Sequence, residues 1–209
     1  MRDFAKKYGT LLVVAIALFL AAVGGWLYWQ NRQQQQTAEQ SEELMRVFTD
    51  IGAGRNETVP QRLEPLESAK NDLVRATALL TGAAVALEKN DRDTARAKYR
   101  AIADDGSMPE TYRHLALVRV TALEFDSMRP EDVVTRLQPL AQAGNPWFGS
   151  AGEMTAMAYL KQGRKEEAGR LFAAIAADQQ VPESIRSRAV QIAGTLGIDA
   201  TASLPAQTQ

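Results

Sequence analysis

The sequence predicts an all-α protein in which an N-terminal single transmembrane helix precedes an α-solenoid of about four helix pairs. Three observations lead to this fold class. Residues 8–30 contain no charged side chain. The rest of the chain is rich in alanine and places its apolar residues three and four apart, which is the period of an amphipathic helix. One group of small and aromatic residues also recurs at fixed spacing, which is typical of repeated helix pairs.

The apolar segment is long enough to cross a bilayer. Residues 11–29 would span a hydrocarbon core of roughly 30 Å, since a helix rises about 1.5 Å per residue. Trp26, Tyr28 and Trp29 lie together at its end, where aromatic side chains with one polar atom favour the lipid headgroup region. We therefore predict a transmembrane helix at residues 8–30, with these three residues as its membrane-interface anchor.

The charges on either side of this segment predict its orientation. Three basic residues and one acid precede it, whereas only Arg32 follows it closely. This bias places residues 1–7 in the cytoplasm as a short segment, and the C-terminal domain on the other side of the membrane. A cleaved signal peptide is the alternative, because Ala22-Val23-Gly24 resembles a cleavage site, although the apolar run continues past it into aromatic residues.

Beyond the apolar segment, we predict one helical domain at residues 31–200 and a frayed polar tail at residues 201–209. The Gln-rich stretch after residue 30 contains no Gly or Pro, and we expect it to continue the first helix rather than to form a flexible stalk. Gly, Asn and Pro residues divide the domain. The predicted helices cover residues 37–51, 59–69, 72–88, 92–104, 109–126, 130–142, 147–162, 165–177 and 182–196.

The repeat is clearest in two sets of residues displaced by 73 positions. Two antiparallel helices that approach closely need a small residue on each, a glycine at the chain reversal and aromatic residues toward the next pair. The two sets are Ala83, Ala86, Asn90, Ala95, Tyr99, Pro109 and Ala156, Tyr159, Gly163, Ala168, Phe172, Pro182, and a weaker one is Thr121, Glu124, Met128, Val133, Leu137, Pro146.

This order of small residue, aromatic residue, glycine, alanine, aromatic residue and proline resembles the tetratricopeptide repeat. Residues 156–182 match it best, and residues 76–109 match with Asn90 in place of the turn glycine. A degenerate pair at residues 37–69 would complete the stack. A generic helical bundle is the alternative fold.

Residues 4 to about 197 also resemble the YfgM-like family of bacterial inner-membrane proteins. The features that carry this resemblance are Gly-Gly-Trp-Leu-Tyr-Trp-Gln at residues 24–30, a polar helix with residues 41–48, and about four helix pairs. The resemblance implies a single-pass protein of the bacterial inner membrane with a periplasmic repeat domain, ancillary to the Sec translocon. The implied partners are Sec translocon subunits, periplasmic chaperones or exported proteins. Residues 1–7 are shorter than the acidic cytoplasmic segment expected for the family.

The composition argues against catalysis, metal binding and nucleic-acid binding. The chain has no cysteine, and its single histidine, His114, is followed four residues later by Val118 rather than by an acid. A formal net charge of −1 gives no basic surface for nucleic acid. We therefore predict a non-enzymatic protein without a metal or cofactor.

Stacked helix pairs expose a concave surface formed by the first helix of each pair. Apolar residues there would form a partner-binding groove for an apolar or amphipathic segment of another chain. The alternative is that several of them are core residues and the register is shifted by one. The predicted groove residues are Leu80, Leu87, Leu115, Val118, Phe125, Met157 and Leu160.

The function that follows is that of a membrane-anchored protein-interaction module, ancillary to the Sec translocon and the periplasmic chaperone network. A self-associating structural scaffold of the cell envelope is the alternative. For that alternative, Ala17, Ala21 and Gly25 form a weak small-residue face through which transmembrane helices could associate into a homo-oligomer.

Overall fold

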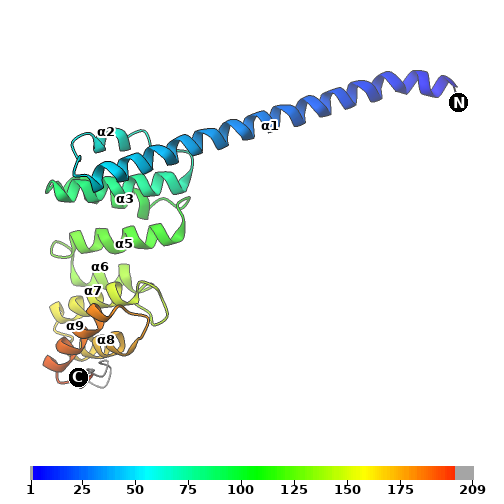
Figure 1. Ribbon diagram of the computed structural model, residues 1–209. Helices are drawn as coiled ribbons and strands as arrows, with labels where there is room; N and C mark the ends of the chain where they lie inside the picture. Colours follow the sequence, from blue (N-terminus) through cyan, green and yellow to red (C-terminus); the bar gives the residue numbers. More distant parts are fainter. Residues whose placement is uncertain (1, 201–209) are drawn as a thin grey trace, which may run out of the picture. The chain divides into compact units, whose positions relative to one another are not determined.

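The computed structural model describes residues 2–200, and within that range every regular element is a helix (Figure 1). Side chains are described for residues 18–200, except at residue 21. The all-helical fold predicted from the sequence is confirmed, and the predicted tail at residues 201–209 lies outside the described residues. The chain divides into two compact units, residues 1–78 and residues 79–209, with the boundary inside the third helix.

The first unit contains α1 (Arg2–Gly52) and α2 (Val59–Leu63). The Gln-rich stretch is helical, as predicted, so α1 runs without a break through the apolar segment into the first helix pair (Figure 1). Leu44 and Val47 of α1 are buried, as are Val59 and Leu63 of α2, and the two helices are in contact. Burial of these apolar side chains fixes α2 against the C-terminal part of α1.

Within the part of the chain whose side chains are described, no helix is both long enough and apolar enough to cross a membrane. Residues 8–17 and residue 21 of the predicted transmembrane helix lie outside the described side chains, and these include Ala17 and Ala21 of the predicted small-residue face.

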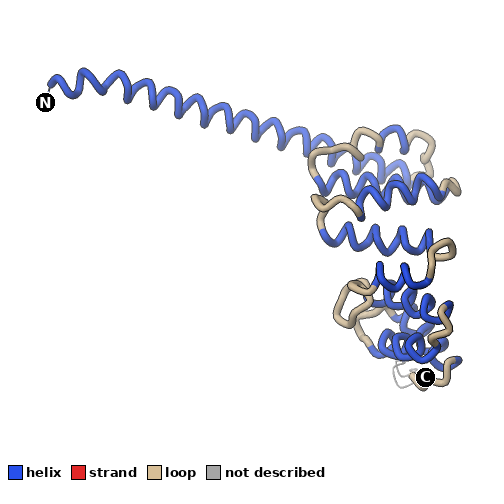
Figure 2. The backbone as a smooth tube through the Cα atoms, turned by 180° about the vertical axis from the view of Figure 1, so that it is seen from behind, coloured by secondary structure: helices blue, strands red, loops and turns tan. Residues whose placement is uncertain are grey.

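The second unit consists of antiparallel helices joined by short loops (Figure 2). α4 packs on α5, α6 packs on α7, and α8 packs on both α7 and α9. The first helices of neighbouring pairs also touch, since α5 contacts α7 and α7 contacts α9. This pattern is that of a solenoid of helix pairs. Its helices are the C-terminal part of α3 (Asp72–Glu88), then α4 (Arg92–Ala103), α5 (Glu110–Glu124), α6 (Pro130–Leu137), α7 (Phe148–Lys161), α8 (Lys165–Ala177) and α9 (Glu183–Thr195).

The turns inside two helix pairs have the same geometry, which explains their repeated sequence. Asn90 and Gly163 both adopt positive φ, of 59° and 76°. In each turn the next residue donates its backbone N–H to a carbonyl five residues earlier, from Asp91 to Ala86 at 2.8 Å and from Arg164 to Tyr159 at 2.9 Å. Glycine and asparagine tolerate this left-handed helix end best, so Asn90 replaces the turn glycine without changing the fold.

The close helix approach predicted for the last pair is also present. Ala156 of α7 and Ala168 of α8 are fully buried, and both belong to the same core cluster as Phe172. Tyr159 is half-buried against this cluster. Small residues at 156 and 168 therefore allow the two helices to meet while the aromatic side chains fill the space beside them.

Two predicted helices were too long, and both end early for the same reason. α2 ends at Leu63 rather than at residue 69, and α6 ends at Leu137 rather than at residue 142. In both places a proline follows two residues later, and proline has no N–H to continue the helix. The chain instead tightens into a turn in which Leu66 donates to Leu63 at 2.8 Å and Leu140 donates to Leu137 at 2.9 Å.

These two ends belong to a second internal repeat, displaced by 74 residues. The sequence Leu-x-Pro-Leu occurs at residues 63–66 and again at residues 137–140, and all four leucines are buried. The arginine before each motif binds an acid near the end of the preceding helix, Arg62 to Asp50 and Arg136 to Glu124. The α1/α2 and α5/α6 pairs are therefore built alike.

Candidate partner-binding groove

An open groove with a volume of about 550 Å³ lies within the second unit. Leu80, Ala84 and Leu87 of α3 line one side, since spacings of four and three place them on one face of the helix. Leu115 and Arg119 of α5 line the other side. Tyr99 of α4 and Glu88 at the end of α3 complete the lining. We call this set of seven residues the α3–α5 groove.

The α3–α5 groove contains three of the residues predicted from the sequence, namely Leu80, Leu87 and Leu115. All three are half-buried, so part of each apolar side chain remains open to solvent. Ala84 lies between the two leucines of α3 and leaves room for an incoming side chain, because it carries only a methyl group. The groove can therefore accept a large aliphatic group between α3 and α5.

Two other predicted groove residues face a different way. Val118 of α5 is only 7% exposed and belongs to a core cluster with Val133 and Leu137 of α6. Phe125 packs against the same cluster and is half-buried. α5 carries apolar residues on more than one face, so its periodicity alone did not show which face points to the core.

The remaining two predicted groove residues lie on α7 and outside the α3–α5 groove. Leu160 is half-buried and packs against the core cluster of the last helix pair. Met157 is 38% exposed and belongs to the surface of α7. The structure therefore distributes the seven predicted residues among one groove, two core clusters and one exposed position.

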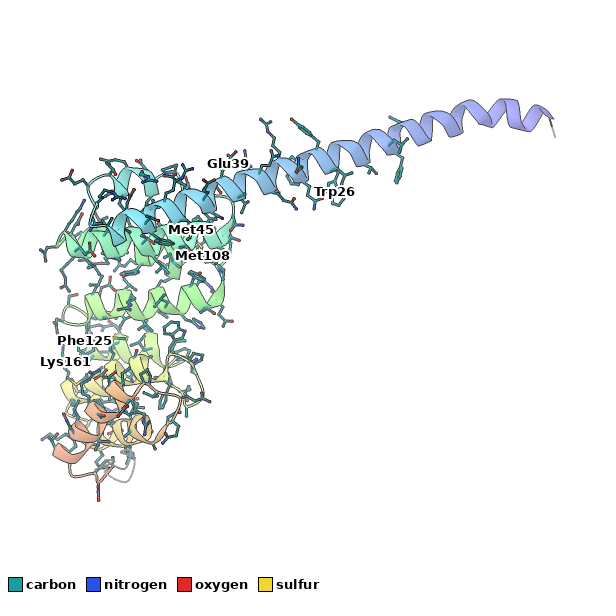
Figure 3. All side chains as sticks on the ribbon, viewed as in Figure 1. Trp26, Glu39, Met45, Met108, Phe125 and Lys161 are labelled. Carbon is teal, nitrogen blue, oxygen red and sulfur yellow. The ribbon has the colours of Figure 1, made fainter. Side chains whose placement is uncertain are left out.

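A cationic side chain covers Phe125 (Figure 3). The Lys161 Nζ atom lies 4.3 Å from the centre of the Phe125 ring, which is a favourable cation–π distance. The same Nζ atom lies 3.1 Å from Oδ1 of Asp126. Phe125 thus has an apolar cluster on one side and the Lys161 ammonium group over its ring, and it offers little free apolar surface to a partner.

Tyr99 and Arg119 were not predicted as groove residues. The sequence pattern predicts Tyr99 only as an aromatic residue of the repeat, and Arg119 lies outside the predicted groove because that groove is entirely apolar. Burial raises the pKa of the Tyr99 hydroxyl, and the positive charge of Arg119 acts in the opposite direction. The repeat spacing could have identified Arg119. A displacement of 35 residues relates Leu80 to Leu115 and Ala84 to Arg119, so Arg119 occupies the position on α5 that Ala84 occupies on α3.

The predicted interface-anchor residues lie on α1. Trp26, Tyr28 and Trp29 are 61%, 67% and 59% exposed, and Leu18, Phe19 and Leu20 before them are exposed as well. Figure 3 shows Trp26 projecting from the helix surface. This part of α1 therefore presents large apolar side chains to its surroundings.

His114 packs beside an acid on its own helix, with 3.6 Å between its Nε2 atom and Oε1 of Glu110. Among the residues whose side chains the structure describes, no group of three or more His, Asp or Glu residues is placed to hold a metal ion.

The fold and the groove together define a helical-repeat protein with an open, largely aliphatic groove between the first helices of two neighbouring pairs. The chain belongs to the tetratricopeptide repeat-like domain family, whose pattern matches residues 2–193. No solved structure matches it significantly.

Two curated relatives confirm the resemblance to the YfgM-like family. A protein of Haemophilus influenzae named "Ancillary SecYEG translocon subunit" is 25% identical over 138 residues, which cover 66% of this chain and 67% of the relative. A protein of Escherichia coli K12 with the same name is 21% identical over 168 residues, which cover 80% of each chain.

Proposed function

We propose that this protein is a non-enzymatic interaction module that is anchored in the bacterial inner membrane, ancillary to the Sec translocon, and captures apolar or amphipathic segments of other chains. The observation that carries the proposal is the α3–α5 groove with its half-buried leucines. The groove belongs to a chain of the tetratricopeptide repeat-like domain family. The names of the two curated relatives support the association with the translocon.

The proposed anchor is residues 8–30, with residues 1–7 in the cytoplasm and residues 31–200 in the periplasm. Three features support it: the absence of charge in the segment, the exposed aromatic residues at its end, and the continuity of α1 through it. An anchor would hold the groove near membrane partners and raise its effective concentration there, so that weak contacts suffice.

The proposed clients are exported proteins and periplasmic chaperones that expose an apolar face. An amphipathic helix can lay its apolar stripe into a groove of this kind. Leu80 and Leu87, two turns apart on α3, would contact successive apolar residues of such a helix.

Site-specific crosslinking in native membranes tests the proposal. Photoreactive residues at Leu87 and Leu115 report on the groove, and one at Leu18 reports on the apolar segment. Ala101 is the matched control, because it is exposed on α4 but does not line the groove. We expect exported chains or chaperones to crosslink to the groove positions, Sec subunits to crosslink to Leu18, and neither to crosslink to Ala101.

Two results would contradict the proposal. Equal yields at Ala101 and at the groove positions would show that the groove has no special role. Adducts only with a second copy of this chain would support the self-associating scaffold instead.

A further inference from the structure

The α3–α5 groove contains two polar side chains without a partner. Tyr99 is 5% exposed, and its hydroxyl makes no hydrogen bond to any residue that the structure describes. Arg119, on the opposite helix, likewise has neither a hydrogen bond nor an ion pair within the described part of the chain. Other arginines of this unit differ, since Arg100 and Arg136 both bind the carboxylate of Glu124.

Most of the Tyr99 side chain is buried, but its hydroxyl keeps contact with solvent at the groove, so an incoming group can replace water as its hydrogen-bond partner. Tyr99 and Arg119 both line the groove, and the Arg119 charge acts on the Tyr99 hydroxyl. Both groups are hydrogen-bond donors, and one of them carries a positive charge. An incoming carboxylate would accept hydrogen bonds from both.

The acid of the groove does not cancel this preference. Glu88 lines the groove as well, but it already has a partner within the chain. The charge that remains without a partner in the groove is therefore the positive charge of Arg119, and it lies beside the aliphatic surface of Leu80, Leu87 and Leu115.

We infer that the α3–α5 groove takes an amphipathic segment of a partner chain whose aliphatic side chain packs between α3 and α5 and whose carboxylate binds Arg119 and the Tyr99 hydroxyl. This inference rests on the proposed function and specifies the chemistry of the partner. An apolar residue supplies affinity in such a site, and the carboxylate supplies selectivity.

The test uses the full chain in lipid nanodiscs and three short fluorescent helical peptides. The peptides share two leucines one turn apart and differ at one position between them, which is Glu, Gln or Lys. Fluorescence anisotropy gives each dissociation constant, and empty nanodiscs measure binding to lipid alone. We expect the Glu peptide to bind about tenfold more tightly than the Gln peptide, since charge-assisted hydrogen bonds are about twice as strong as neutral ones. The Lys peptide should bind most weakly.

Variants of the chain assign the preference to its residues. Arg119→Gln should bring the Glu and Gln peptides to nearly equal affinity, because it removes the positive charge that distinguishes the carboxylate from the amide. Tyr99→Phe should reduce the preference in part, because it removes only the hydroxyl. Arg170→Gln is the matched control, since Arg170 is an exposed arginine on α8 outside the groove, and it should leave the preference intact.

The outcomes separate this inference from the proposed function. Equal binding of the Glu and Gln peptides by the unmodified chain would overturn the inference and leave apolar capture standing. Binding of none of the three peptides would overturn both. A preference for Glu that persists in Arg119→Gln would overturn the inference by placing recognition elsewhere. Self-association that the Glu peptide disrupts would overturn it in favour of a second copy as the occupant.

Discussion

At the residue scale, Val118 and Leu87 show that two aliphatic side chains of neighbouring helix pairs can have different roles. Both were predicted for the same groove, but Val118 is 7% exposed in a core cluster whereas Leu87 is half-buried and lines the groove. Apolar periodicity could not separate them, because α5 has apolar residues toward both the groove and α6. The sequence shows that the first helix of each pair carries apolar residues, but it does not show which face of that helix points to the core.

This difference predicts opposite results for the same substitution. Val118→Asp should destabilise the fold by roughly 3 kcal/mol or more, since it places a carboxylate among apolar side chains. Leu87→Asp should leave the melting temperature nearly unchanged and reduce capture of apolar peptides. Thermal unfolding followed by circular dichroism, with peptide binding on the same samples, measures both effects. Equal stability of the two variants would contradict the assignment of Val118 to the core.

Asp91 gives a residue-scale prediction about pH. Its carboxylate caps α4 by accepting a hydrogen bond from the Thr94 backbone N–H at 3.1 Å. Hydrogen bonds from Thr94 lower the pKa of Asp91 below its ordinary value of 3.8. A lowered folded pKa means that the cap contributes fully above the ordinary value and loses its contribution as the pH falls through the folded pKa.

We therefore expect Asp91→Ala to lower the melting temperature at neutral pH, and the difference from the unmodified chain to shrink in strong acid. Asp91→Asn is the control, because an amide oxygen caps the helix but does not titrate in this range. A difference between Asp91→Ala and the unmodified chain that is constant from neutral pH to strong acid would contradict the role of the ionised cap.

At the element scale, a buried acid holds three helices of the second unit together. Glu124 of α5 is 5% exposed, and it binds Arg100 of α4 and Arg136 of α6, the latter at 2.8 Å between Oε2 and Nη1. Arg96 of α4 also approaches it, with 3.9 Å between its Nε atom and the Glu124 carboxylate. Three arginines therefore converge on one carboxylate, and its removal would leave their positive charges close together without the negative charge that they share.

We expect Glu124→Ala to lower the free energy of unfolding by about 2 to 3 kcal/mol, below the upper range for a buried pair because the arginines still reach water. Asp126→Ala is the control, since Asp126 is almost fully exposed and its pair with Lys161 should contribute less than about 1 kcal/mol. Urea denaturation measures both values. Similar losses in the two variants would contradict the structural role of Glu124.

The elements also show what the sequence could and could not predict. The six helices other than α1, α2 and α6 begin and end within two residues of their predicted bounds, because Gly, Asn and Pro residues mark the turns between them. The early ends of α2 and α6 were missed, although Pro65 and Pro139 are visible in the sequence, since apolar residues continue past them. Tyr99 and Arg119 were missed because a buried phenol and an exposed arginine become a pair only when α4 and α5 are folded together.

At the scale of the whole molecule, the absence of cysteine makes the topology simple to measure. We expect Gln191→Cys, at an exposed position on α9, to react with a membrane-impermeant maleimide in spheroplasts. Ala5→Cys should react only after the membrane is opened, because the proposed topology places residues 1–7 in the cytoplasm. The reverse pattern, or labelling of both positions in intact spheroplasts, would contradict a single-pass anchor with a periplasmic domain.

The unbroken course of α1 has a further consequence for the first unit. One rigid helix carries both the exposed aromatic residues at 26–29 and the buried residues that hold α2, so the direction in which α2 faces is tied to the direction in which Trp26 faces. Each residue added to the Gln-rich stretch would turn α2 by about 100° around the helix axis but move it by only about 1.5 Å. Seven added residues would restore the facing while they lengthen the stretch by about two turns. Changes in the length of α1 would therefore alter the orientation of α2 relative to Trp26 more than the distance between them.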